Sequence, residues 1–147
     1  PELKRRGLFP AGRLDKDTVG LVLITDDGDY AHRLLSPARA IYKRYQAIID
    51  APVTAEHVQQ FAQGTSLADG TRCLPAKLQI LHGGEQPLVE VSICEGKYHQ
   101  IKRMFGALDR KVLWLKRVSM GSLELDENLK EGECRLLQGE ETALVFR

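Results

Sequence analysis

The chain has 147 residues, with 21 Lys and Arg against 20 Asp and Glu, and 43% of its residues are hydrophobic. This length is typical of one domain that can bury a hydrophobic core. No uninterrupted apolar run is longer than that of residues 21–24, which is too short for a membrane-spanning helix. Three widely spaced cysteines argue against a disulfide framework and for a reducing compartment. We therefore expect a soluble cytoplasmic domain.

Hydropathy periods and turn signals predict a series of short elements after a loop over residues 1–10. The expected strands, in chain order, cover residues 19–25, 41–50, 75–81, 88–94, 111–118, 122–125 and 134–137. The expected helices cover residues 29–35, 54–63 and 98–108, with a last short one near residue 140. Strands outnumber helices and are often joined by turns. The predicted fold class is therefore α+β, with a mixed, mostly antiparallel sheet flanked by short helices.

The net charge of +1 hides a basic segment. Residues 97–117 contain Asp109 as their one acidic residue and seven basic ones: Lys97, Lys102, Arg103, Arg110, Lys111, Lys116 and Arg117. Aromatic residues lie among them, a pattern that suits a surface facing a polyanion such as RNA. A solvated helix face followed by a strand rim has the same pattern, so charge alone leaves both interpretations open.

Polar residues are densest in the segment Gly12-Arg13-Leu14-Asp15-Lys16-Asp17-Thr18, which leads into the first expected strand. An aspartate on a loop beside a strand is well placed to hold a fixed carboxylate, although a turn that caps the next element has the same residues. Asp15 and Asp17 also match the D-x-D pattern of aspartyl phosphatases, but that pattern follows an apolar strand, which is missing here. A calcium loop fails because Val19 would occupy an oxygen-ligand position. Metal-ligand spacings such as Cys-x-x-Cys are absent from the sequence, so no metal site is predicted.

Several spaced motifs together resemble the RNA pseudouridine synthases. They are Gly12-Arg13-Leu14-Asp15, Lys43-Arg44-Tyr45, Lys97-Tyr98-His99-Gln100-Ile101-Lys102-Arg103 and Leu115-Lys116-Arg117. They occur in the family's order over nearly the whole chain, and Tyr98-His99-Gln100 is most similar to the RsuA branch, which modifies small-subunit (16S) ribosomal RNA. The resemblance implies the catalytic-domain fold of these synthases and the isomerisation of uridine to pseudouridine.

The resemblance also implies roles for three catalytic residues. Asp15 matches the family's nucleophilic aspartate, and Lys102 matches the cation that pairs with it, which a carboxylate removed from water requires. Tyr45 matches the tyrosine that stacks on the target base and assists proton removal from C5. Without the motifs, Lys102 would be interpreted as an exposed helix lysine and Tyr45 as a packing residue. His99 has no predicted catalytic role.

Five basic residues are the predicted RNA contacts. Arg13 matches an arginine that related synthases insert in place of the flipped base, which offsets the cost of extruding the nucleotide. The predicted phosphate contacts are Lys97, Arg103, Lys116 and Arg117. The resemblance implies ribosomal RNA as the partner, with no cofactor, no membrane and a monomeric state.

Family members usually begin with an S4-type RNA-binding domain, which this sequence does not contain. We therefore interpret residues 1–147 as a single, N-terminally truncated catalytic domain. Three alternatives remain open: a large-subunit rRNA synthase of the same family, a non-catalytic RNA-binding module that retains the fold, and a magnesium-dependent aspartyl phosphatase-like hydrolase.

Overall fold

A six-stranded sheet forms the centre of the computed structural model, which describes residues 7–147. The elements in chain order are β1 Phe9–Ala11, β2 Val19–Gly20, β3 Leu23–Thr25, α1 Gly28–Leu35, a 3₁₀ turn Pro37–Arg39, β4 Lys43–Ile49, α2 Ala55–Gln63, β5 Lys77–His82, β6 Leu88–Ile93, α3 Gln100–Gly106, β7 Val112–Met120, β8 Leu123–Glu124 and α4 Glu141–Leu144. The sheet has the order β2-β7-β4-β6-β5, with β8 beside β7. Only the pairing of β2 with β7 is parallel, so the predicted mixed, mostly antiparallel sheet is confirmed.

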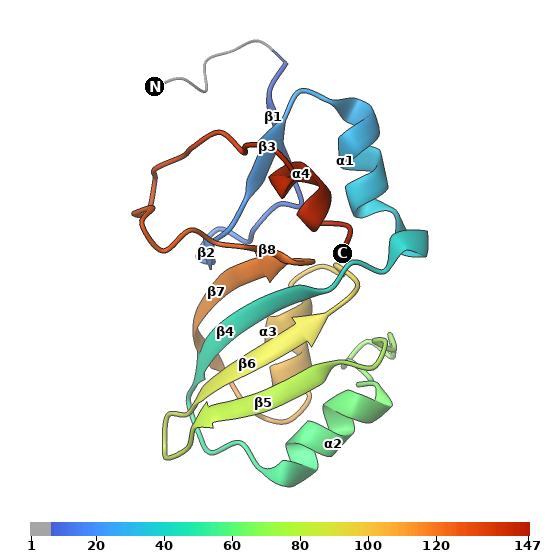
Figure 1. The fold of residues 1–147 in the computed structure, drawn as a ribbon. Helices are drawn as coiled ribbons and strands as arrows, with labels where there is room; N and C mark the ends of the chain where they lie inside the picture. The colour runs from blue at the N-terminus through green and yellow to red at the C-terminus, as the bar shows by residue number, and fades with distance from the viewer. Residues whose placement is uncertain (1–6) are drawn as a thin grey trace.

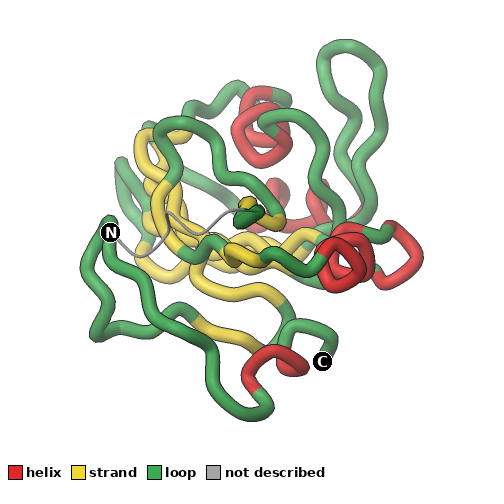
Figure 2. Tube along the Cα trace, turned by 90° about the horizontal axis from the view of Figure 1, so that it is seen from above, coloured by secondary structure: helices red, strands yellow, loops and turns green. Residues whose placement is uncertain are grey.

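Two groups of elements lie one above the other in Figure 1. The small pair β1–β3, α1 and α4 occupies the upper end, and the large sheet with α2 and α3 forms the rest. Seen from above in Figure 2, helices lie on both sides of the strands, and the C-terminus lies beside a short helix. None of the helices among residues 7–147 is long and apolar enough to cross a membrane.

Local sequence signals account for several elements. Thr54 caps α2 and accepts a hydrogen bond from the His57 N–H, and Gly64 ends the helix with φ of 95°. Asp27 caps α1 in the same way, by accepting from the Tyr30 N–H. The predicted hairpin forms from β5 and β6, which pair antiparallel.

Four expectations differ from the structure. The strand expected over residues 19–25 is divided into β2 and β3, because Gly20 has φ of 113° and the chain leaves the large sheet there. The helix expected over 98–108 begins later, at Gln100, because His99 is left-handed with φ of 47°. Residues 134–137 form no strand: Leu137 packs against the smaller hydrophobic cluster from a loop, and Leu136 is 84% exposed. The loop expected over 1–10 gives way to β1 at Phe9, and its residues 1–6 lie outside the described residues.

Each group of elements has its own hydrophobic cluster. The larger cluster lies where α2 and α3 cover one face of the sheet, and it includes Ala47, Ile49, Phe61, Val89, Val91, Met104 and Phe105. The smaller cluster joins β1, β3, α1 and the C-terminal helix, and it includes Ala11, Leu23, Leu34, Met120 and Val145. Tyr45 belongs to the first cluster and Ala11 to the second, so the loop that follows β1 passes between the two.

Candidate active site

A cavity of about 290 Å³ lies where the loop after β1 meets β4, β7 and the segment that leads into α3. Its walls bring together residues that are far apart in the sequence, since β4 pairs antiparallel with β7 and places Tyr45 opposite Arg117. Of the residues predicted for the site, five line it: Arg13, Asp15, Tyr45, Lys97 and Arg117. Lys102 lies beside it, on α3.

The side chains of His99 and Lys102 approach the Asp15 carboxylate. The His99 Nε2 atom lies 3.7 Å from one carboxylate oxygen, and the Lys102 Nζ atom lies 3.9 Å from the other. The Asp15 side chain is 30% exposed, so solvent reaches it through the cavity. The Lys102 ammonium places a positive charge beside this carboxylate, which is the arrangement expected around a nucleophilic aspartate.

Lys102 makes its shortest contact with another carboxylate. Its Nζ atom lies 2.6 Å from an oxygen of Asp17, against 3.9 Å for Asp15. That hydrogen bond, together with the charge of Lys102, holds the pKa of the Asp17 carboxyl below its ordinary value. A lysine ammonium is a compact point charge on a flexible stem, so it settles between the two carboxylates rather than in a bidentate pair with one. The expected salt bridge is therefore shared, and Asp17 holds the larger part.

The turn that presents His99 is built by a buried glutamine. The Gln100 side chain accepts from the Lys97 N–H at 3.0 Å and donates to Glu95 at 3.1 Å. Glu95 also accepts from the backbone of Leu74 and pairs with Lys97 at 3.2 Å. These bonds hold the left-handed backbone of His99, a conformation that non-glycine residues adopt at a cost and that often marks functional sites. His99, which has no role in the sequence-based prediction, thereby reaches Asp15.

Arg117 is the basic residue whose position differs most from expectation. Its side chain is 1% exposed, and its guanidinium donates to the carbonyls of Gly12 at 2.5 Å and Leu21 at 2.8 Å. A third donor lies 3.5 Å from the Tyr45 hydroxyl. A buried guanidinium with these partners does not fit the predicted phosphate contact. Arg117 instead ties both ends of the Asp15 loop to β7 and contacts the Tyr45 hydroxyl on the neighbouring strand β4.

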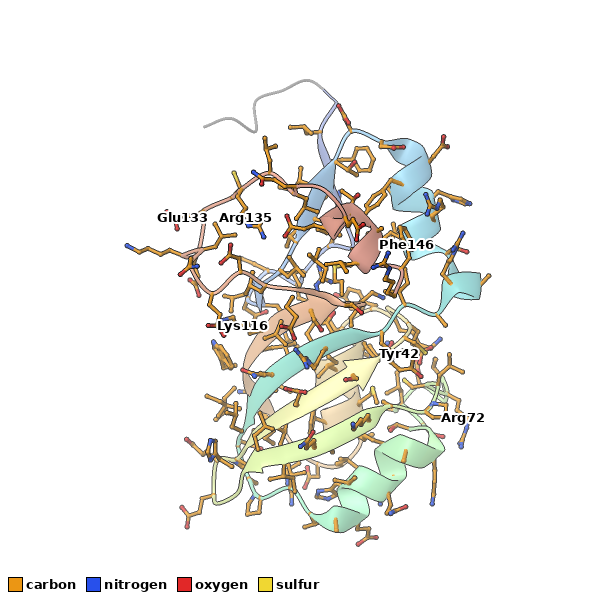
Figure 3. The ribbon with its side chains drawn as sticks, viewed as in Figure 1. Tyr42, Arg72, Lys116, Glu133, Arg135 and Phe146 are labelled. Atoms are coloured by element: carbon orange, nitrogen blue, oxygen red, sulfur yellow. The ribbon has the colours of Figure 1, made fainter. Side chains whose placement is uncertain are left out.

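Lys116 and Arg103 also lie away from the cavity wall. Side chains alternate along a strand, so Lys116 faces away from Arg117. It lines a second hollow of about 100 Å³ beside the loop that carries Glu133, on the side shown in Figure 3. Contact between Lys116 and a nucleotide in the main cavity therefore does not fit the structure. Arg103 pairs with Asp69 at 2.7 Å and donates to the Tyr98 carbonyl, which supports the turn before α3.

Arg13 and Lys97, both predicted RNA contacts, line the cavity but differ in exposure and pairing. Arg13 is exposed, which suits a group that meets incoming RNA. Lys97 is paired with Glu95. Among residues 7–147, no group of three or more His, Cys, Asp or Glu side chains is arranged to hold a metal ion.

Comparisons with known proteins agree with the motif resemblance. Residues 1–107 match the family model described as RNA pseudouridylate synthase. The chain is 44% identical over 147 residues to a Vibrio cholerae protein named ribosomal small subunit pseudouridine synthase A, covering 99% of this chain and 62% of that protein. It is 42% identical to a Bacillus subtilis protein named uncharacterized RNA pseudouridine synthase YtzG, with 99% of this chain and 61% of that protein covered.

A solved structure described as a pseudouridylate synthase superposes with a TM-score of 0.89 at 44% identity, covering 95% of this chain and 60% of that one. The chain thus spans about three fifths of the length of the relatives it matches. The likeness extends over the elements that form the cavity, from the loop after β1 to β7.

Proposed function

The chain belongs to the RNA pseudouridylate synthase family, and from this premise we propose that it isomerises uridine to pseudouridine in small-subunit ribosomal RNA. The observation that carries the proposal is the Asp15 carboxylate, which lines a cavity with Tyr45 and lies within 4 Å of the His99 imidazole and the Lys102 ammonium. A carboxylate held in this way is suited to nucleophilic work on a nucleotide turned out of its stack.

The reaction breaks the N1–C1′ bond of uridine, turns the detached uracil and joins C5 to C1′. In the proposed mechanism Asp15 is the nucleophile, and His99 and Lys102 lie beside its two carboxylate oxygens and orient it. Tyr45 lies against the base, and its hydroxyl assists removal of the C5 proton. Arg117 contacts that hydroxyl and the Gly12 carbonyl, and so fixes Tyr45 and the Asp15 loop relative to each other. Every step uses side chains of this chain, so we expect no need for a metal or cofactor.

The proposal that the substrate is small-subunit rRNA is supported by the names of the related proteins. Several proteins of 44–47% identity carry the name ribosomal small subunit pseudouridine synthase A, which favours small-subunit rRNA over the large-subunit alternative. Arg13 at the rim is the proposed contact that fills the space left by the flipped base. We propose a monomer that acts in the cytoplasm, where ribosomal RNA is available.

Release of tritium from rRNA labelled at uridine C5 tests the proposal, because C5 loses its hydrogen when pseudouridine forms. We expect release from small-subunit rRNA, in the presence of a chelator, and much less from large-subunit rRNA. Asp15→Asn should abolish release and leave RNA affinity within a few-fold, because the amide keeps the shape of the side chain but is not a nucleophile.

Asp109→Asn is the matched control. It makes the same chemical change at an exposed residue with φ of 56°, a conformation that asparagine tolerates. Release that survives in Asp15→Asn would remove Asp15 as the nucleophile. Tight RNA binding without release from the unaltered chain would favour a binding module, and dependence on magnesium would favour a hydrolase.

A further inference from the structure

Lys43 is a basic residue of the cavity wall to which the proposed mechanism gives no role. It lies two residues before Tyr45 on β4 and lines the same cavity as Asp15. No ion pair or hydrogen bond joins its ammonium group to any residue in the range 7–147. Lysine usually extends its ammonium into water or onto a carboxylate, so this position needs a reason.

The neighbouring groups already have other partners. Two acidic groups act favourably on Lys43, the Cys94 thiol and the Glu95 carboxylate. Cys94 interacts with the Tyr42 hydroxyl, and Glu95 pairs with Lys97 and accepts two further hydrogen bonds. Asp15 lies between His99 and Lys102. Lys43 is therefore the inner cation of the cavity that is available to a ligand, whereas Arg13 is available at the rim.

Burial and the nearby Arg117 guanidinium hold the pKa of Lys43 below its ordinary value. Both effects oppose the charged form, so the ammonium makes the folded state less stable than a neutral side chain of the same size would. Natural proteins retain residues that lower stability where those residues serve function. Because Lys43 faces the cavity, we expect its function to be a contact with the molecule that the cavity binds.

The strand geometry indicates which part of the substrate meets Lys43. Residues two apart on a strand point to the same face, about 7 Å apart. A uracil lying against the Tyr45 ring therefore has its polar edge within reach of the Lys43 ammonium. Phosphates stay at the rim with the RNA backbone, on the side where Arg13 is exposed.

Building on the proposed function, we propose that Lys43 donates a hydrogen bond to a carbonyl oxygen of uracil and stabilises the negative charge on the detached base. When the N1–C1′ bond breaks, its electron pair stays on uracil and spreads over N1 and the two carbonyl oxygens. Joining C5 to C1′ uses an electron pair of the base for the new bond, and the C5 hydrogen leaves as a proton. A charged donor fixed at that edge acts most strongly while the base is anionic, which is the condition for lowering the barrier.

Lys43→Met tests this, since methionine keeps the length of the side chain and removes the charge. Under single-turnover conditions with excess protein, we expect tritium release to slow by about 100-fold, the effect typical of losing one such donor. RNA affinity should stay within threefold and its salt dependence should not change. The urea midpoint at pH 7 should be no lower than that of the unaltered chain, and Lys43→Arg should recover part of the rate.

Lys77→Met is the control, because Lys77 is an exposed lysine at the start of β5, outside the cavity. Three results overturn the inference: a rate within threefold of the unaltered chain, a loss confined to RNA affinity with a salt slope lower by about one, or no recovery in Lys43→Arg. The second result would make Lys43 a phosphate contact.

Binding of 5-nitrouracil, an acidic analogue that carries the anion near neutral pH, tests Lys43 without turnover. We expect Lys43→Met to bind it at least tenfold more weakly, with neutral uracil affected less. If the unaltered chain released no tritium but bound the analogue through Lys43, the proposed reaction would fail and the base-binding role would stand. Equal binding of the analogue by both proteins would overturn that role.

Discussion

Replacing Arg117 with methionine should weaken the fold and the site together. Arg117 is buried, and its guanidinium donates to the Gly12 and Leu21 carbonyls. A hydrogen bond to a charged group contributes about 1.5–3 kcal/mol, so losing two removes about 3–6 kcal/mol. Part of this is recovered because a buried charge disappears, together with its repulsion of Lys43. We expect a net loss of about 2–4 kcal/mol in the free energy of unfolding.

Urea denaturation monitored by circular dichroism measures this loss. A domain of this size has about 5–15 kcal/mol in total, so Arg117→Met should remain folded with a clearly lower midpoint. Arg117→Lys keeps the charge but loses the planar guanidinium. We expect its urea midpoint to lie between those of the unaltered chain and Arg117→Met. Arg72→Met is the control: Arg72 is exposed (Figure 3), bonded to Ser66 and a carbonyl, and its loss should cost less than about 1 kcal/mol.

Arg117→Met also tests whether Arg117 positions the catalytic residues in addition to stabilising the fold. Well below its urea midpoint and fully folded, Arg117→Met should still release tritium more slowly, because the Asp15 loop is no longer tied to β7 and the Tyr45 hydroxyl loses its contact with the guanidinium. RNA affinity should change little, since Arg117 is buried. An unfolding free energy within about 0.5 kcal/mol of the Arg72→Met value would refute the structural reasoning. A strong loss of RNA affinity would restore the phosphate contact expected from the sequence.

Three further outcomes follow from local geometry. Gly20→Ala should cost more than about 2 kcal/mol in urea denaturation, because a Cβ would lie 2.1 Å from the Arg117 carbonyl oxygen and φ is 113°; an unchanged midpoint would contradict the parallel pairing of β2 and β7. Asp17→Asn removes the closest partner of Lys102, so the ammonium can move toward Asp15. The single-turnover rate of tritium release should therefore stay the same or rise, and a large fall in that rate would give Asp17 a role of its own. Because the pKa of Asp17 is lowered in the folded state, its contribution to stability is present above about pH 4 and lost as pH falls through the lowered value; the urea midpoint of Asp17→Asn should therefore fall less steeply below pH 4 than that of the unaltered chain.

The elements predicted well from the sequence are those that neighbouring residues decide. The cap at Thr54, the ending at Gly64 and the hairpin of β5 and β6 depend on side chains within a few positions of one another. The strand expected over 19–25 was wrong as a single element because its break depends on a distant partner. The backbone at Gly20 must approach the carbonyl of Arg117, and nothing within residues 19–25 signals that approach.

For the candidate site, the sequence could indicate which residues lie close together but not which side-chain contacts each of them makes. Asp15 and Tyr45, which the motifs associate, line one cavity together with Lys97, and their predicted roles stay predictions. That Lys102 lies closer to Asp17 than to Asp15 depends on side-chain geometry within one turn, which no spacing reveals. The opposite orientations of adjacent residues on β7 did have a signal. Leu115 is an apolar strand residue, so the residue two positions later shares its face and the one between them does not.

The basic segment illustrates why charge was a weaker guide than motif order. Over residues 97–117, five of the seven basic side chains have partners within the protein: Lys97, Lys102, Arg103, Arg110 and Arg117. These contacts hold the turn before α3, the Asp15 loop and the end of β7, so much of the segment's charge organises the site rather than facing solvent. The cations left available at the cavity, Arg13 and Lys43, come from outside the segment. A search for RNA contacts should therefore begin with the cations that lack internal partners rather than with the densest run of charge.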